Sequence, residues 1–372
     1  MLLIALGLFF TSLFLCVIGT AIVRRYAASI GLIDHPGLRK VHDTPKARSG
    51  GIAIFWAMAI PLLIGIAAAG LFAHQPLENI LPASVRLYLP GLAAHRLLAL
   101  WLLICTLGIH VVGLVDDRRA MAAVPKLVWQ LVMAGALVGG GEIIQTGGFR
   151  VLTIMDHLFP GGVVISALVS VVWIVVLTNA FNFMDNMDGL SAGVAAICGS
   201  LFFIAAFQAQ QWFICGLLLL YVGSVTGFLF HNFPPAKIFM GDGGSMVLGF
   251  FLAALTIRTT FYAGHGRWYA VLMPLLVAAV PLYDFVIVCL LRLRSGRSPF
   301  IGDTNHFSHR LTRHGFTKRG AVLVIYAVTL ASGLSAPLLA RANGFEAVLI
   351  GAQCLSILII VGILERLGEH VQ

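Results

Sequence analysis

Five aspartates stand in short polar segments of an otherwise apolar chain: Asp116, Asp117, Asp185, Asp188 and Asp242. Each of these segments, GLVDDRR, NAFNFMDNMDGL and IFMGDGGS, adjoins an apolar run long enough to cross a membrane. A carboxylate next to lipid is costly, so a function usually accounts for its presence there. The five aspartates fall on one predicted side of the membrane and together indicate a site that binds a cation and, through it, phosphate.

Asp116 and Asp117 are adjacent at the end of a predicted span. Two neighbouring carboxylates repel each other, and a divalent cation or a nearby base relieves that repulsion. A simpler alternative is a pair of solvated residues at a helix end, neutralised by Arg118 and Arg119. The pair alone does not separate these two interpretations.

A second group of polar residues recurs at intervals of three: Asn179, Asn182, Asp185 and Asp188. On an ideal α-helix these positions drift across about 180° of the surface, so they share a face only if the segment is partly 3₁₀ or unwound. Irregular polar backbone at membrane depth must line a cavity. Amide and carboxylate oxygens suit Mg²⁺, which keeps positions for phosphate. The alternative is a capped loop before the next span.

Asp242 lies in FMGDGGS, where glycines permit close approach of the backbone to a phosphate. Phe239, just before it, could stack on a flat base. Helix capping by Asp242 is the simpler alternative.

Two further loops carry polar residues. In DTNHFSHRL, His306 and His309 lack the additional ligands of a zinc site, so hydrogen bonds to sugar hydroxyls and phosphate are the better use. Arg310 in the same loop suits bidentate contact with phosphate. In the first loop, Arg48 precedes Gly50 and Gly51 at the start of a span, an arrangement that suits an anchoring point for a lipid phosphate.

The elements that must position these residues are transmembrane helices. The chain of 372 residues is 59% hydrophobic and 10% charged, with a mean hydropathy of +0.97, which excludes a soluble core. We predict an all-α, polytopic membrane protein with a single transmembrane domain over 1–372, with ten spans as the alternative to eleven. The eleven predicted spans are 2–23, 51–73, 95–115, 127–141, 162–178, 190–208, 212–230, 246–262, 269–291, 321–340 and 345–364.

The basic residues predict the orientation, because Lys and Arg are retained on the cytoplasmic side. If the first loop is cytoplasmic, eighteen of the twenty-four Lys and Arg residues face inward, as do nine of the ten aspartates. The N-terminus is then outside and the C-terminus cytoplasmic. Topology also accounts for the net charge of +9, so we expect no nucleic-acid partner. The loops predicted to form the site are 24–50, 116–126, 179–189, 231–245 and 292–320.

In chain order, the segments GLIDHPGLRKVHDTPKARSGGIAIF, GLVDDRR, NAFNFMDNMDGLSAG, IFMGDGGS and DTNHFSHRL resemble the polyprenyl-phosphate N-acetylhexosamine-1-phosphate transferase family. The resemblance implies an Mg²⁺-dependent enzyme, with Mn²⁺ as an alternative metal. Such an enzyme transfers a sugar 1-phosphate from a UDP-sugar to undecaprenyl phosphate and releases UMP. It implies a bacterial cytoplasmic (inner) membrane, an active site facing the cytoplasm, and leaves a homodimer open.

The resemblance also implies a role for each matching residue. Asn182 and Asp242 would bind the metal, and Asp116 and Asp117 would act at the lipid phosphate, as a base or as metal ligands. Asn179, Asp185 and Asp188 would hold the nucleotide, with Phe239 against the uracil. Lys126 and Arg48 would contact phosphate, and His306, His309 and Arg310 would contact the sugar and its phosphate. Asp34, Asp43, Asp284 and Asp303 receive no role.

One residue departs from the family pattern: Ala120 replaces the usual third acid after Asp116 and Asp117. Within the family, His306 and His309 without a run of three histidines favour a GlcNAc-1-phosphate enzyme, the first membrane step of a cell-surface glycan pathway. The alternative is the phospho-MurNAc-pentapeptide transferase of peptidoglycan synthesis. An ion-coupled transporter is the alternative of another class, but it predicts charges near the midplane and repeated halves.

Overall fold

The computed structural model describes residues 2–34, 45–72, 89–145, 148–152, 160–259, 268–299 and 304–369. Apolar runs in lipid satisfy their backbone hydrogen bonds internally, and these runs are helical here. The α-helices are α1 (Leu2–Tyr26), α2 (Gly50–Phe72), α4 (Leu89–Arg118), α5 (Ala123–Ile144), α7 (Gly162–Met184), α8 (Leu190–Gln208), α9 (Trp212–Asn232), α10 (Asp242–Arg258), α11 (Met273–Val277), α12 (Ala279–Arg294), α13 (Phe307–Arg313), α14 (Lys318–Gly333) and α15 (Gly344–Glu369). Two 3₁₀ helices, η2 (Trp268–Leu272) and η3 (Ala336–Leu338), join them.

The helices agree with the predicted all-α membrane architecture. Within the described residues, nine helices are long and apolar enough to span a membrane, and the pair Tyr269–Val277 and Ala279–Arg294, bent by 71°, gives a tenth. Helix α10 has only 17 residues. Together with α10, these helices coincide one for one with the eleven predicted spans.

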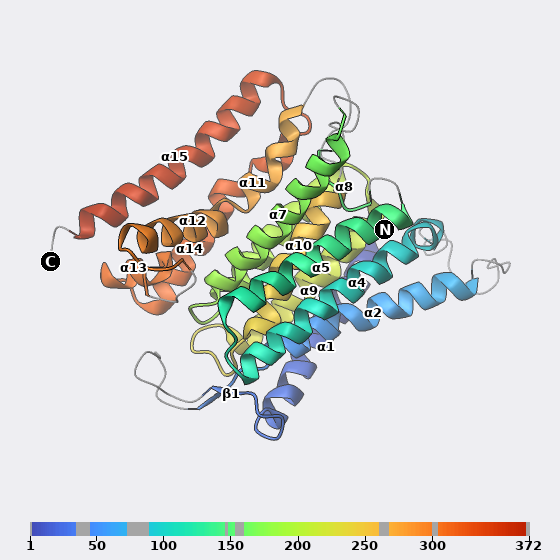
Figure 1. The fold of residues 1–372 in the computed structure, drawn as a ribbon, viewed down its shortest axis with the longest axis horizontal. Helices are drawn as coiled ribbons and strands as arrows, with labels where there is room; N and C mark the ends of the chain where they lie inside the picture. The colour runs from blue at the N-terminus through green and yellow to red at the C-terminus, as the bar shows by residue number, and fades with distance from the viewer. Residues whose placement is uncertain are drawn as a thin grey trace.

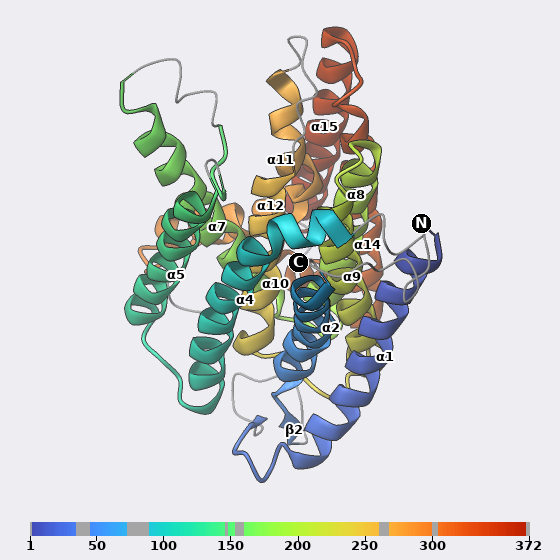
Figure 2. The ribbon, with the colours of Figure 1, turned by 90° about the vertical axis from the view of Figure 1, so that its right-hand side faces the viewer.

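Helix α10 forms the centre of the bundle. It is buried from Asp242 to Thr256 and packs against α7, α4 and α2. Figure 1 shows α4, α5, α7 and α10 running side by side, with α15 along one edge. Figure 2 shows α5 and α1 on opposite sides of the bundle, with α10 between them. An apolar helix surrounded in this way gives a rigid platform for its first residue, Asp242.

Glycines allow the start of α10 to approach its neighbours at backbone distance. A Cβ added to Gly51 would lie 2.3 Å from the nitrogen of Gly244, and one added to Gly113 would lie 2.5 Å from Cα of Gly243. Small residues give membrane helices their closest contacts, because packing rather than water exclusion drives their association. The start of α10 is therefore fixed against α2 and α4.

Short extended segments cover the same end of the bundle. Strand β1 (Ile33–Asp34) pairs antiparallel with β2 (Lys46–Ala47). The chain after β2 runs beside the segment before α10: the Phe239 amide donates to Ala47, and the Gly50 and Gly51 amides donate to Phe239 and Met240. These bonds hold Arg48 next to Asp242.

Candidate active site at the start of α10

Asp117, not Asp242, caps helix α10. Gly241 has φ 76°, a left-handed conformation that favours glycine, and it turns the chain into the helix. The amides of Asp242 and Gly243 then donate to the Asp117 carboxylate over 2.8 and 3.0 Å. The Asp117 side chain is fully buried and also pairs with Nε of Arg48 at 2.9 Å. It thus joins α4, α10 and the first loop.

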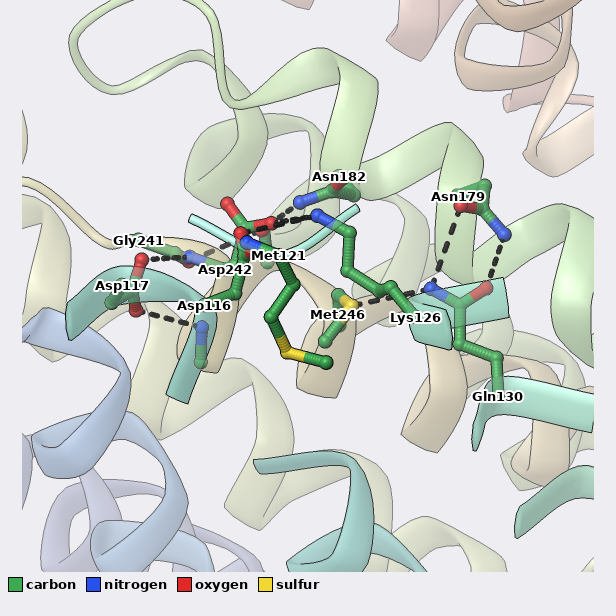
Figure 3. A network of polar contacts seen from close by, with 12 residues as sticks. Asp116, Asp117, Met121, Lys126, Gln130, Asn179, Asn182, Gly241, Asp242 and Met246 are labelled. Carbon is green, nitrogen blue, oxygen red and sulfur yellow. Dashed lines mark hydrogen bonds and ion pairs between the residues drawn. The ribbon is translucent and has the colours of Figure 1, made fainter. Parts of the chain in front are cut away.

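The carboxylate of Asp242 is left to meet two cations. One oxygen lies 2.9 Å from Arg48 and the other 2.6 Å from Nζ of Lys126. Lys126 also pairs with Asp116 at 3.2 Å, and the Met121 amide donates to Asp116 over 2.7 Å. Figure 3 shows Lys126 and Asp116 meeting at Asp242. The side chain of Asp242 therefore contacts a cluster of charged residues. The alternative that Asp242 only caps helix α10 is wrong.

The end of α7 also contributes residues to the site. Regular helix ends at Met184 and the chain unwinds from Asp185, so the predicted irregular segment begins only after Asn182. Asn182 lies beside Asp242 (Figure 3) and donates to Ser245 over 2.9 Å. Asn179, one turn earlier, exchanges hydrogen bonds with Gln130 of α5.

Asp185 completes the cluster. Its carboxylate accepts from the Gly241 amide and lies near Asp242, Arg48 and Asp117. Burial, and then the charge of Asp242, raises the pKa of Asp185 well above its ordinary value. Burial would lower the pKa of Arg48, but Asp117 and Asp242 more than offset it, so its pKa stands above the ordinary value.

We call this cluster the acidic centre; it consists of Arg48, Asp116, Asp117, Lys126, Asp185 and Asp242. Four carboxylates face two basic groups there. The excess of negative charge favours an added cation, and the two basic groups favour phosphate.

Two predicted nucleotide residues, Asp188 and Phe239, are half-buried in the segments that precede α8 and α10. Asp188 accepts from the Ala236 amide over 2.9 Å, which ties the end of α7 to the segment before α10. Phe239 is half-buried, and Nζ of Lys46 lies 5.0 Å from its ring centre. One cation already contacts this ring, as a positively charged group commonly does with an aromatic face.

The predicted sugar-binding residues lie in a second region, residues 304–314, which we call the α13 segment. His306 directs Nδ1 to Asp284 at 2.9 Å. Arg310 is buried; its Nε pairs with Glu365 at 2.9 Å, and Nη1 donates to the carbonyl of Asn305. Its guanidinium thus has a structural partner in α15.

His309 lies between these residues in the α13 segment. Its ring centre is 6.4 Å from that of His306. Burial, followed by the electrostatic effects of His306 and Arg313, lowers the pKa of His309. Because the ordinary value is already near 6.5, His309 is neutral at neutral pH and can both donate and accept.

Sequence reasoning missed four residues that build these two regions: Ser245, Asp284, Asn186 and Glu365. Asp284 and Glu365 stand within apolar spans and are separated from their partners by 22 and 55 residues. Ser308 donates to Asn186, which fastens the α13 segment to the end of α7. An isolated acid inside an apolar run was the only available signal. Asp43 and Asp303 lie outside the described residues.

The donor set of the acidic centre fits a hard divalent cation. No group of three His, Cys, Asp or Glu side chains arranged to hold a metal occurs within the described ranges. Mg²⁺, however, commonly takes one or two carboxylates and completes its shell with water and substrate phosphate. Asp242 beside the amide of Asn182 supplies such an incomplete set.

Fold and site together define a multi-pass membrane protein with a charged, phosphate-compatible centre at one end of its helices. The sequence model described as Glycosyl transferase family 4 matches residues 99–260, which include all of the acidic centre except Arg48.

Similar proteins extend the match over nearly the whole chain. A Bacillus subtilis protein named probable undecaprenyl-phosphate N-acetylglucosaminyl 1-phosphate transferase is 32% identical over 338 residues, covering 90% of this chain and 85% of the relative. A Mycobacterium tuberculosis decaprenyl-phosphate N-acetylglucosaminephosphotransferase is 32% identical, with 90% and 82% covered. An undecaprenyl-phosphate alpha-N-acetylglucosaminyl 1-phosphate transferase from Yersinia pestis is 28% identical, with 85% and 78% covered. The chain belongs to glycosyl transferase family 4, and the resemblance of its motifs is confirmed.

Proposed function

We propose that this protein transfers GlcNAc-1-phosphate from UDP-GlcNAc to undecaprenyl phosphate, with Mg²⁺, at the cytoplasmic face of a bacterial inner membrane. The products are undecaprenyl-pyrophosphoryl-GlcNAc and UMP. The observation that carries the proposal is the acidic centre, in which Asp242 meets Arg48 and Lys126 at the end of a buried helix. The names of the relatives support the sugar and the lipid acceptor.

The proposed reaction exchanges one phosphorus–oxygen bond for another. An oxygen of the lipid phosphate attacks the sugar-proximal phosphorus of UDP-GlcNAc. The bond from that phosphorus to the bridging oxygen breaks, and its electron pair leaves with UMP. A phosphate monoester is largely ionised near neutral pH, since its second pKa is about 6. Positioning and charge stabilisation then supply most of the catalysis.

Each residue of the acidic centre has a defined part in this proposal. Arg48 and Lys126 contact phosphate oxygens of the two substrates. Asp116 places Lys126, which it contacts at 3.2 Å. Asp117 is fully engaged by Arg48 and the start of α10, so it holds the site in shape.

The metal is expected at Asn182 and Asp242. When bound there, Mg²⁺ supplies charge neutralisation for the pyrophosphate and the departing UMP. Asp185 and Asp188 are proposed to hold the nucleotide, with Phe239 near the uracil and His309 near the sugar.

The test is release of UMP by the purified protein with UDP-GlcNAc, undecaprenyl phosphate and Mg²⁺. We expect UMP only when all three are present. UMP from UDP-MurNAc-pentapeptide but not from UDP-GlcNAc would replace the sugar assignment with the peptidoglycan reaction. Absence of UMP with either donor would overturn the proposed function.

A further inference from the structure

Asp284 is a buried acid to which the transfer chemistry assigns no part. It lies on α12, is fully buried, and uses both oxygens on the α13 segment. One oxygen is 2.9 Å from Nδ1 of His306, and the other accepts from the Phe307 amide over 2.6 Å. The second bond satisfies an amide at the start of α13. The first bond determines how the imidazole of His306 can act.

The contact with Asp284 selects one tautomer of His306. An ionised carboxylate only accepts hydrogen bonds, so Nδ1 must carry the proton that joins the two groups. In a neutral imidazole the other nitrogen, Nε2, is then the acceptor. The ring is also held edge-on against Phe183 at a centre distance of 5.7 Å. Both the orientation and the proton arrangement of His306 are therefore fixed by buried neighbours.

The same segment is fastened beside the acidic centre. Ser308 donates to Asn186, the residue directly after Asp185, and Phe183 is the residue before Met184 at the end of α7. His306 thus stands against the stretch of chain that delivers Asp185. His306 is therefore held on the same side of the site as Asp185, one of the proposed nucleotide contacts.

We propose that Asp284 is a positioning residue for the transfer: it keeps Nδ1 of His306 protonated so that Nε2 faces the sugar-phosphate portion of the donor as an acceptor. This inference rests on the proposed function. A carboxylate that orients a histidine in this manner is a recurring arrangement in enzymes.

Asp284→Asn separates this role from a role in folding. The amide oxygen can still accept from the Phe307 amide, while the amide NH₂ donates to Nδ1 of His306 and forces the proton onto Nε2. We expect kcat to fall by about tenfold or more, with an unchanged KM for undecaprenyl phosphate. Asp284→Glu, which keeps the carboxylate, should recover part of the loss.

The direct readout is nuclear magnetic resonance of the protein with isotope-labelled histidine nitrogens, in which His306→Gln identifies the His306 signals. We expect a protonated Nδ1 in the wild type and a protonated Nε2 in Asp284→Asn. Glu365→Gln is the matched control, because it neutralises the other buried acid that holds the α13 segment without touching His306. It should leave the His306 tautomer unchanged.

A double-mutant cycle completes the test. Asp284→Asn combined with His306→Gln should be no slower than His306→Gln alone, because the two residues act as one unit. An unchanged tautomer, a wild-type kcat in Asp284→Asn, or additive losses would overturn the inference. If the wild type itself releases no UMP, the proposed function fails, whereas an active wild type with an indifferent Asp284→Asn refutes only this inference.

Discussion

In the acidic centre, carboxylates from α4, α10 and the end of α7 crowd together and share two cations. In the α13 segment, Asp284 and Glu365 instead each hold a separate partner, His306 and Arg310. Both regions bury charge in an apolar bundle, which is costly unless the charge is paired. The surplus of carboxylates in the first region suits an added cation and phosphate. The matched pairs in the second suit the placement of side chains. The presence of a buried aspartate or glutamate does not by itself show whether the residue binds a ligand or positions another side chain.

The largest effect is expected from removing the central carboxylate. Asp242→Asn keeps the shape of the side chain but removes the charge that meets Arg48, Lys126 and the proposed metal. We expect a loss of about 10²–10³-fold in kcat, measured as UMP release. The control is Glu346→Gln, in the first turn of α15, which should retain wild-type turnover. Comparable turnover of the two variants would contradict the assignment of Asp242.

Asp116 and Asp117 are adjacent, yet they should differ in what they stabilise. In Asp117→Asn the amide NH₂ would face Arg48 and the amides at the start of α10, and breaking a buried pair costs about 3–5 kcal/mol. Asp116→Asn breaks only the contact with Lys126, at a side chain with 10% exposure. Thermal unfolding in detergent should show the larger drop in Tm for Asp117→Asn. Equal decreases in Tm for the two variants would show that Asp117 contributes no more to stability than Asp116.

The glycine contacts give a smaller, steric test. A Cβ at Gly113 would lie 2.5 Å from Gly243, so Gly113→Ala must displace the start of α10, at a cost of about 1–3 kcal/mol. A Cβ added to Gly139 on α5 would have no neighbour within 4 Å. Gly139→Ala is therefore the matched control. We expect reduced activity and Tm only for Gly113→Ala. Identical behaviour of the two variants would argue that α10 is not fixed through these contacts.

The smallest effect concerns pH. Because burial and then Asp242 raise the pKa of Asp185 well above 3.8, the folded protein holds this proton more tightly than the unfolded chain. The stability that Asp185 contributes is complete below the ordinary pKa and is lost as pH rises through the raised pKa. The Tm of the wild type should therefore fall relative to that of Asp185→Asn as pH rises above about 4.

Added Mg²⁺ provides a control for this titration. A bound cation favours the ionised carboxylate, so it should narrow the difference between the two Tm curves. Parallel curves at every pH would contradict the raised pKa of Asp185.

The apolar runs in the sequence predicted most of the fold, because a span must be apolar along its whole length and eleven such runs are separable. It also predicted that Asp116, Asp185 and Asp242 lie close together, since positive-inside topology brings their loops to one side. The division of work between Asp116 and Asp117 was not predictable. It depends on which carboxylate faces the amides of α10, a tertiary contact across 125 residues.

Asp284 and Glu365 show the other limit. Asp284 is the single acid of α12, and Glu365 lies near the end of the apolar helix α15. The partner of each acid lies far along the chain. Local sequence cannot indicate whether such an acid faces lipid, substrate or a buried histidine. The chain also bends by 71° directly before α12, the helix that carries Asp284.

The central claim is that the acidic centre promotes cleavage of the pyrophosphate bond of the donor. It is tested most directly by supplying UDP-GlcNAc radiolabelled in the sugar-proximal phosphate, together with undecaprenyl phosphate and Mg²⁺. Transfer of sugar 1-phosphate places the label in the lipid product and leaves the released UMP unlabelled. Label recovered in released UDP, with only the sugar carried to the lipid, would contradict the account.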